Sequence, residues 1–330
     1  MIKAIQNCFK IPELRSRLLF TLGILAVYRL GAHIPSPGIN GRVLAEQLAS
    51  QKGGLMGFYD MFAGGALGRA TVFALGIMPY ISVSIIMQLL TAVVPALEKL
   101  SKEGAEGRKK ITQYTRYGTV LLGLFQSFMF AKMLAGKPGI VPNPGPLFYM
   151  TTIITFTTGV IVIMWLGEQI TERGIGNGMS LIICMSIVSR MPNALTIAAK
   201  QIETGELSIF RFILVLLMSV GVVMGIIAIT LGQRRIPIQQ ARQVKGRKVY
   251  GGQRSFLPLR VNHAGVIPII FASAIMMFPT MLGNWLQRFE IDWLDWFMGQ
   301  FGQGQSLYML TSVALIVFFC YFYTAITFNP

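Results

Sequence analysis

The chain has 330 residues, of which 53% are apolar and 13% are charged, and its mean hydropathy is +0.60. Soluble globular proteins carry about 25% charged residues. The composition therefore excludes a soluble enzyme, a secreted disulfide scaffold and a disordered chain, and it indicates a protein that crosses a membrane several times. Lys and Arg together number 29 against 13 Asp and Glu, and this excess must lie outside the hydrocarbon.

Apolar runs along the chain mark the predicted membrane helices, because a helix needs about 20 largely apolar residues to cross about 30 Å of hydrocarbon. Eight such runs occur, at 18–34, 70–94, 117–134, 147–167, 179–189, 212–232, 264–286 and 306–328. The fifth is the shortest, since Arg190 and Pro192 follow it, and polar residues extend it on both sides. The predicted fold class is an all-α polytopic membrane protein.

The distribution of Lys and Arg sets the predicted orientation, because cytoplasmic connections retain cations. With residues 1–17 in the cytoplasm, the cytoplasmic segments carry 19 of the 29 cations and the opposite side carries 9. The remaining cation, Arg29, lies inside the first run. The sequence therefore predicts a cytoplasmic N-terminal segment at 1–17.

Two features of the runs bear on function. None of the eight contains Asp or Glu, whereas ion-coupled transporters place carboxylates near the membrane centre, and this argues against such a transporter. Gly and Pro recur inside the runs, as at Gly76 and Pro79. Irregular backbone at membrane depth must be buried in protein or line a cavity, but the same residues also allow close helix packing, and the sequence leaves both interpretations open.

The connection at 35–69 is too long for a simple hairpin between two spans. Within it, Leu55, Phe58, Tyr59 and Phe62 recur at the spacing of one helix face, and a glycine pair ends the pattern. About two to three turns of amphipathic helix cannot cross a bilayer. This piece therefore either lies on the membrane surface or re-enters among the helices, and the pattern does not choose between the two.

Residues 233–260 are predicted to form a strongly basic cytoplasmic loop, here called the basic segment, with eight Lys or Arg and no acidic residue. Such a segment binds either anionic lipid headgroups or a large acidic partner, which is nucleic-acid phosphate or an acidic protein face. Its two aromatic residues are too few to argue for base stacking.

Patterns for catalysis, nucleotide binding or metal binding are not found. The glycine-rich stretch at 174–178 lacks the Gly-x-Gly-x-x-Gly spacing, and it is interpreted as a tight cytoplasmic turn into the fifth run. The three Cys and two His residues have no neighbours at ligand spacing. The sequence therefore predicts no enzyme activity, no cofactor and no metal.

Six sequence motifs resemble the SecY family, the channel subunit of bacterial Sec protein translocases. They are ALGIMPYIS at 74–82, KEGAEGR at 102–108, QYTRYG at 113–118, GEQITERGIGNG at 167–178, LPLRVN at 257–262 and FYTA at 322–325. The resemblance implies ten spans in two inverted halves of five helices. Residues 18–198 then form the first half and 199–330 the second, which ends before spans nine and ten.

The resemblance also implies roles for individual residues. The pore ring of the channel is expected at Ile77, Ile81, Met179, Ile183 and Ile270, with Met where the family commonly has Ile. The plug, at 55–67, is expected to include Leu55, Phe58, Tyr59, Phe62 and Leu67. The lateral gate is expected to include Gln88, Thr119 and Asn262, and docking of the ribosome and of the motor ATPase SecA is expected at Arg242, Lys245, Arg247, Lys248 and Arg254.

The implied function is a passive protein-conducting channel of the bacterial cytoplasmic (inner) membrane. Its implied partners are the small membrane subunits SecE and SecG, SecA, the ribosome, secretory and membrane protein substrates, and anionic lipid. A secondary transporter, and a scaffold or insertase without a continuous pore, are the competing hypotheses.

Overall fold

The computed structural model describes residues 10–50, 60–137, 139–238, 243–245, 248–250, 255–262, 264–266, 268–273, 275–276 and 305–327. The chain divides into two compact units. The first comprises residues 1–194 and 274–310, and the second comprises 195–273 and 311–330.

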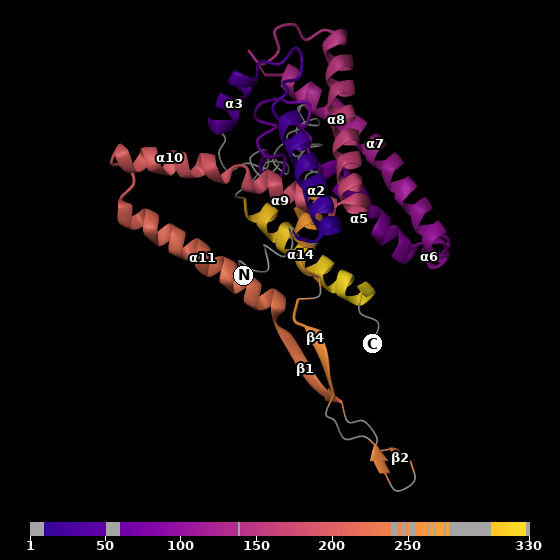
Figure 1. Ribbon diagram of the computed structural model, residues 1–330. Helices are drawn as coiled ribbons and strands as arrows, with labels where there is room; N and C mark the ends of the chain where they lie inside the picture. The colour runs from indigo at the N-terminus through magenta and orange to yellow at the C-terminus, as the bar shows by residue number, and fades with distance from the viewer. Residues whose placement is uncertain are drawn as a thin grey trace. The chain divides into compact units, whose positions relative to one another are not determined.

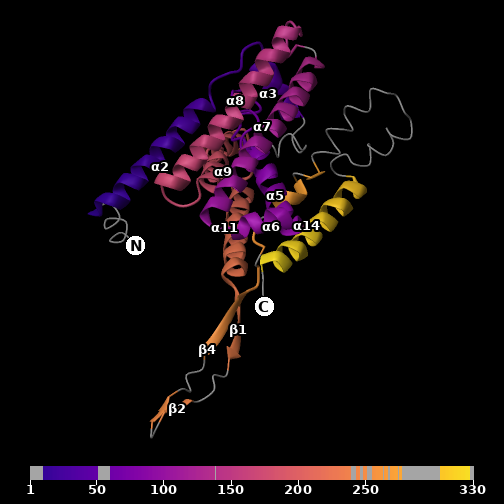
Figure 2. The same ribbon diagram turned by 90° about the vertical axis from the view of Figure 1, so that its right-hand side faces the viewer.

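The first unit is a bundle of helices. Its elements in chain order are α2 (Pro12–Gly31), α3 (Gly41–Ser50), α5 (Met78–Val93), α6 (Pro95–Lys102), α7 (Ala105–Ala135), α8 (Pro146–Arg173) and α9 (Gly178–Val188). Helices α7 and α8 run side by side in both views (Figures 1 and 2), α5 packs on α7, and α2 and α9 pack on α8. The long helix α8 is thus a common neighbour of α2, α7 and α9.

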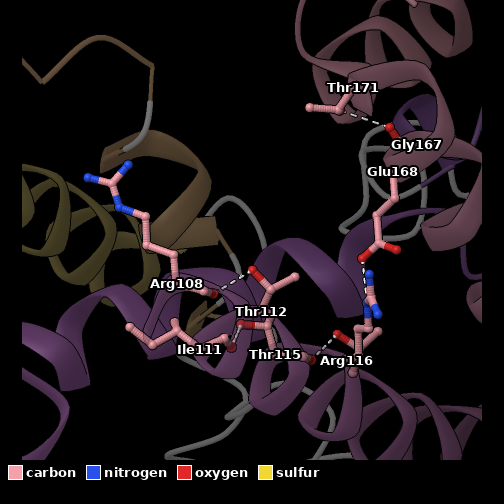
Figure 3. A network of polar contacts seen from close by, with 9 residues as sticks. Arg108, Ile111, Thr112, Thr115, Arg116, Gly167, Glu168 and Thr171 are labelled. Carbon is pink, nitrogen blue, oxygen red and sulfur yellow. Dashed lines mark hydrogen bonds and ion pairs between the residues drawn. The ribbon is translucent and has the colours of Figure 1, made fainter. Parts of the chain in front are cut away.

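Several threonine side chains on these apolar helices form hydrogen bonds within their own helix (Figure 3). The hydroxyls of Thr112, Thr115 and Thr171 each donate to the carbonyl four residues earlier in the same helix. Between helices, Arg116 Nε on α7 lies 2.8 Å from Glu168 Oε1 on α8. This ion pair ties the two longest helices of the unit together.

The turn between α8 and α9 explains the glycine-rich stretch at 174–178. Asn177 caps α9, because its side-chain oxygen accepts hydrogen bonds from the N–H groups of Met179 and Ser180. A Cβ on Gly178 would lie 2.0 Å from the carbonyl oxygen of Gly167, so only glycine allows α9 to start this close to α8. The predicted tight turn into the fifth run is confirmed.

Five helices in the described part of the chain are long and apolar enough to cross a membrane, and a sixth span results if a bent pair is counted as one. The pair is α5 with α6, which meet at 98° where Pro95 begins α6. The second predicted run, at 70–94, is helical only from Met78 onward. Helix α2 covers most of the first run but is not among the five, and most of the seventh run, at 264–286, lies outside the described residues.

The remaining elements are α10 (Met191–Glu203), α11 (Ile209–Leu231), β1 (Gln233–Ile238), β2 (Gln243–Lys245), β3 (Lys248–Tyr250), β4 (Ser255–Arg260) and α14 (Ser306–Thr327). Helix α11 buries none of its residues, although its mean hydropathy is the highest of the five spans, so its surface suits lipid. Strands β1 and β4 pair antiparallel from Gln233 opposite Arg260 to Ile238 opposite Ser255, and β2 pairs with β3. The basic segment, predicted as a loop, therefore contains a two-stranded ladder at its base.

Candidate functional site

An irregular piece of chain lies at the centre of the first unit. Residues 60–77, here called the inner segment, have one short helical turn at 60–62 and continue as turns. Its apolar side chains are buried: Ala63, Ala66, Leu67, Ala70, Phe73, Ala74, Leu75 and Ile77. Its backbone is satisfied partly by local bonds, such as those from Gly65 N to Asp60 O and from Thr71 N to Ala66 O. Irregular backbone is tolerated at membrane depth only inside protein or along a cavity, and this segment meets the first condition.

Helices α2, α8 and α9 enclose the inner segment. Tyr28 on α2 stacks on Phe73 with ring centroids 5.7 Å apart, and its hydroxyl lies 2.7 Å from the Ser186 hydroxyl on α9. On α8, a Cβ at Gly159 would lie 2.0 Å from the Val72 carbonyl oxygen. Close approach at Gly159 therefore lets the segment sit directly against the helix backbone.

Charged side chains also reach the inner segment. The Asp60 carboxylate accepts a hydrogen bond from Gly68 N at 2.9 Å and lies 2.8 Å from Arg190 Nη2, in the turn after α9. Arg29 of α2 donates to the Gly64 carbonyl oxygen at 3.3 Å. Helices that are distant in the sequence thus hold the same few residues of the segment.

The expected plug residues fall on both sides of the described boundary. Leu55, Phe58 and Tyr59 lie outside the described residues. Phe62 is partly buried against the core, and Leu67 is buried. The described part of the stretch, residues 60–67, lies among the helices and not on a surface, and its role as a plug stays a prediction.

Four of the five expected pore-ring residues belong to the first unit. Ile77 is buried in the hydrophobic cluster that contains the inner segment, and Ile81, Met179 and Ile183 pack against that cluster. Met179 Sδ lies 2.3 Å from the position that a Cβ on Gly167 would take, so its thioether rests on α8. Ile270 belongs to the second unit, where it is partly buried.

The expected lateral-gate residues have local environments of different kinds. Gln88 lines a cavity of about 440 Å³ between α5, α6 and α7, together with Tyr80 and Arg108. The buried Thr119 hydroxyl donates to the Thr115 carbonyl oxygen within α7 at 2.7 Å. Asn262 Oδ1 accepts from Gly265 N at 2.9 Å. A role for these residues in gating stays a prediction.

Two of the five expected docking residues belong to the described part of the chain. Lys245 on β2 stands opposite Lys248 on β3, whereas Arg242, Arg247 and Arg254 lie outside the described residues. No group of three or more His, Cys, Asp or Glu side chains that could hold a metal ion occurs within the described ranges.

Sequence reasoning missed the ion pair between Asp60 and Arg190. A signal was present, because Asp60 is a single carboxylate inside the predicted plug and Arg190 ends the fifth apolar run. Their pairing across 130 positions of sequence could not be read from either pattern alone. The stacking of Tyr28 on Phe73 was missed for the same reason.

Comparisons with known proteins agree on one family. The sequence profile of the SecY family matches residues 71–330. The protein translocase subunit SecY of Buchnera aphidicola subsp. Acyrthosiphon kondoi is 49% identical over 322 residues, which is 96% of this chain and 90% of that protein. The subunit of the same name from Escherichia coli (strain K12) is 48% identical, with 96% of this chain and 73% of that protein covered. The Thermus thermophilus subunit is 45% identical over 100% of this chain and 76% of its own length.

Solved structures give the same fold. A protein-conducting channel matches with a TM-score of 0.58 at 21% identity, and Sec61 in the canine ribosome–channel complex matches with a TM-score of 0.58 at 20% identity. Both matches cover 86% of this chain, and the chain spans 64% of the length of each structure. At this identity the likeness establishes the fold only.

Proposed function

The chain belongs to the SecY family, and we propose that it is the central protein-conducting channel of a Sec translocase, which passes unfolded secretory proteins across the bacterial inner membrane. It is a multi-pass membrane protein of a family of channels, not of enzymes. The observation that carries the proposal is the buried inner segment. Irregular backbone is found at membrane depth only inside protein or along a cavity, and a chain that obstructs a channel is such a case.

The proposed mechanism begins with a closed channel. The stretch 55–67 obstructs the path from one side, and the apolar side chains of Ile77, Ile81, Met179, Ile183 and Ile270 form a narrow ring. A narrow apolar constriction excludes ions because water leaves it, yet flexible apolar side chains can part for a passing chain. Such a ring seals without any catalytic or titrating group.

Release into the membrane is the second part of the proposal. The second, third, seventh and eighth spans form the lateral gate, with Gln88, Thr119 and Asn262 beside it. When these spans separate, apolar segments of a substrate reach the lipid and partition there according to their hydrophobicity. The channel itself then needs no energy source for this step.

Energy comes from partners in this proposal. The basic segment 233–260 faces the cytoplasm and binds the ribosome or SecA, whose acidic surfaces match its eight cations. The β1–β4 ladder supports this role, because its paired strands hold three of the eight cations, Arg234, Arg235 and Arg260, in a defined arrangement at the base of the segment. SecE and SecG complete the membrane complex, anionic lipid surrounds it, and the N-terminus lies in the cytoplasm.

Single-channel conductance of the intact protein, with and without residues 55–67, tests the proposal. Deletion is expected to leave the protein inserted and to raise the resting ion conductance. Unchanged conductance in a protein that still inserts would remove the plug assignment.

A further inference from the structure

Four ion pairs occur among the described residues, and two of these join segments that are distant in sequence. One links α7 to α8. The other links Asp60, the first described residue of the inner segment, to Arg190 in the turn between α9 and α10. This second pair joins the turn after α9 to the obstructing chain.

Asp60 makes two separate sets of interactions, one within the inner segment and one with Arg190. Its Oδ1 accepts from Gly68 N at 2.9 Å, and its main-chain oxygen accepts from Gly65 N at 2.9 Å, so it closes the turn on itself. Its Oδ2 points outward to Arg190 Nη2 at 2.8 Å. The side chain of Asp60 is 11% exposed and that of Arg190 is 42% exposed. The pair therefore has one end in the protein and one end near solvent.

Several positive charges surround the turn at Gly64 and Gly65, so the position of this turn depends on the Asp60 carboxylate. Arg69 Nη2 and Arg190 Nε lie 3.5 and 3.9 Å from the position that a Cβ on Gly65 would take, and Arg29 donates to Gly64 O. Three guanidinium groups thus approach one turn of chain. The mutual repulsion of such like charges is offset by a carboxylate among them. Asp60 supplies that negative charge.

We infer that the ion pair between Asp60 and Arg190 positions the inner segment and keeps it in its closed place. The inference rests on the proposed function, in which this segment obstructs a channel. Arg190 is inferred to act through the inner segment that it holds, so it is a positioning residue. Because its guanidinium group is half exposed, the pair can break without unfolding the bundle, as a removable obstruction requires.

The first test measures the position of the segment directly. Leu67 is 1% exposed, so a Leu67→Cys side chain reacts with a water-soluble maleimide only when the segment moves. The three natural cysteines are replaced by Ser for this purpose. Arg190→Gln is expected to increase the labelling rate about three- to tenfold, as loss of a partly buried ion pair implies, and Arg190→Lys, which keeps the charge, is expected to restore a rate close to the original.

Controls separate positioning from general destabilisation. Arg116→Gln breaks an ion pair of the same length between α7 and α8, and it should leave the labelling rate at Leu67→Cys unchanged. Asp60→Asn retains an oxygen for Gly68 N but loses the negative charge among Arg29, Arg69 and Arg190, so it should accelerate labelling at least as much as Arg190→Gln. The double variant should label no faster than Asp60→Asn alone, because the ion pair is already lost in that variant. An unchanged rate in Arg190→Gln, or additive rates in the double variant, would overturn the inference.

The second test links the pair to the channel. Arg190→Gln is expected to raise the resting ion conductance of the intact protein toward that of the variant without residues 55–67. If the deletion raises conductance and Arg190→Gln does not, the positioning role is wrong and the proposed function stands. If Arg190→Gln accelerates labelling while even the deletion leaves conductance unchanged, the pair positions the segment but the obstructing role fails.

Discussion

The contact between α8 and the inner segment at Gly159 makes a quantitative prediction. A Cβ at this position would lie 2.0 Å from the Val72 carbonyl oxygen, whereas a relaxed contact between carbon and oxygen is about 3.3 Å. Gly159→Ala therefore requires α8 and the backbone at Val72 to move apart by more than about 1 Å. Val72 cannot shift freely, because its N–H donates to the Ile34 carbonyl oxygen at 3.0 Å and its neighbours are buried. Overpacking of this kind costs about 1–3 kcal/mol, and we expect the upper end.

Thermal unfolding of the purified protein in detergent measures this cost. A loss of about 3 kcal/mol corresponds to a melting temperature lower by roughly 6–12 °C for a unit of about 200 residues. Gly123→Ala on α7 is the matched control, since its Cβ would meet Val160 Cγ1 at an ordinary 3.7 Å. Equal melting temperatures for the two variants would refute the reasoning, because both place one methyl group in a buried long helix.

Three further predictions follow from the site and the basic segment. Replacement of Ile77 or Ile183 by Asn should wet the constriction, raise ion conductance and relax discrimination against defective signal sequences, and reduced expression with both properties intact would instead indicate ordinary packing. Changing Arg247 and Lys248 together to Glu should weaken binding to ribosomes or SecA in lipid-free detergent, with a smaller salt dependence, and undiminished binding to both would leave this segment as a lipid contact. Asn177→Ala should lower the stability of the first unit by about 1 kcal/mol through loss of the α9 cap, whereas Asn177→Asp should not, as melting temperatures will show.

The helices of this protein could be predicted from the sequence because hydropathy is a local property. Runs such as 117–134 and 147–167 fall inside α7 and α8, and the all-α membrane class is confirmed by the channel structures that share the fold. The start of the second span could not be predicted. Residues 70–77 are as apolar as the helix that follows, but they form turns, in which Gly76 has a φ of +56°.

The contacts of the candidate site depend on tertiary structure and were not predictable. The pairs of Tyr28 with Ser186 and Asp60 with Arg190 each join residues more than 100 positions apart, so no local pattern contains them. The strands at 233–238 and 255–260 were not predicted, because the high positive charge of the segment was interpreted as the mark of a loop. Apolar residues at every second position, Ile236 and Ile238 in one stretch and Leu257 and Leu259 in the other, were the available signal.

Photocrosslinking to a translocating chain tests the central claim most directly. A photoreactive amino acid is placed at Ile183, which packs against the hydrophobic cluster that contains the inner segment, or at Leu121 on α7, whose side chain is 73% exposed and suited to lipid. A secretory protein is then halted midway through translocation in membranes that contain the intact protein. We expect strong crosslinks to the halted chain from position 183 and none from position 121. The absence of crosslinks from position 183, or equal crosslinking from both positions, would contradict a protein-conducting path through this bundle.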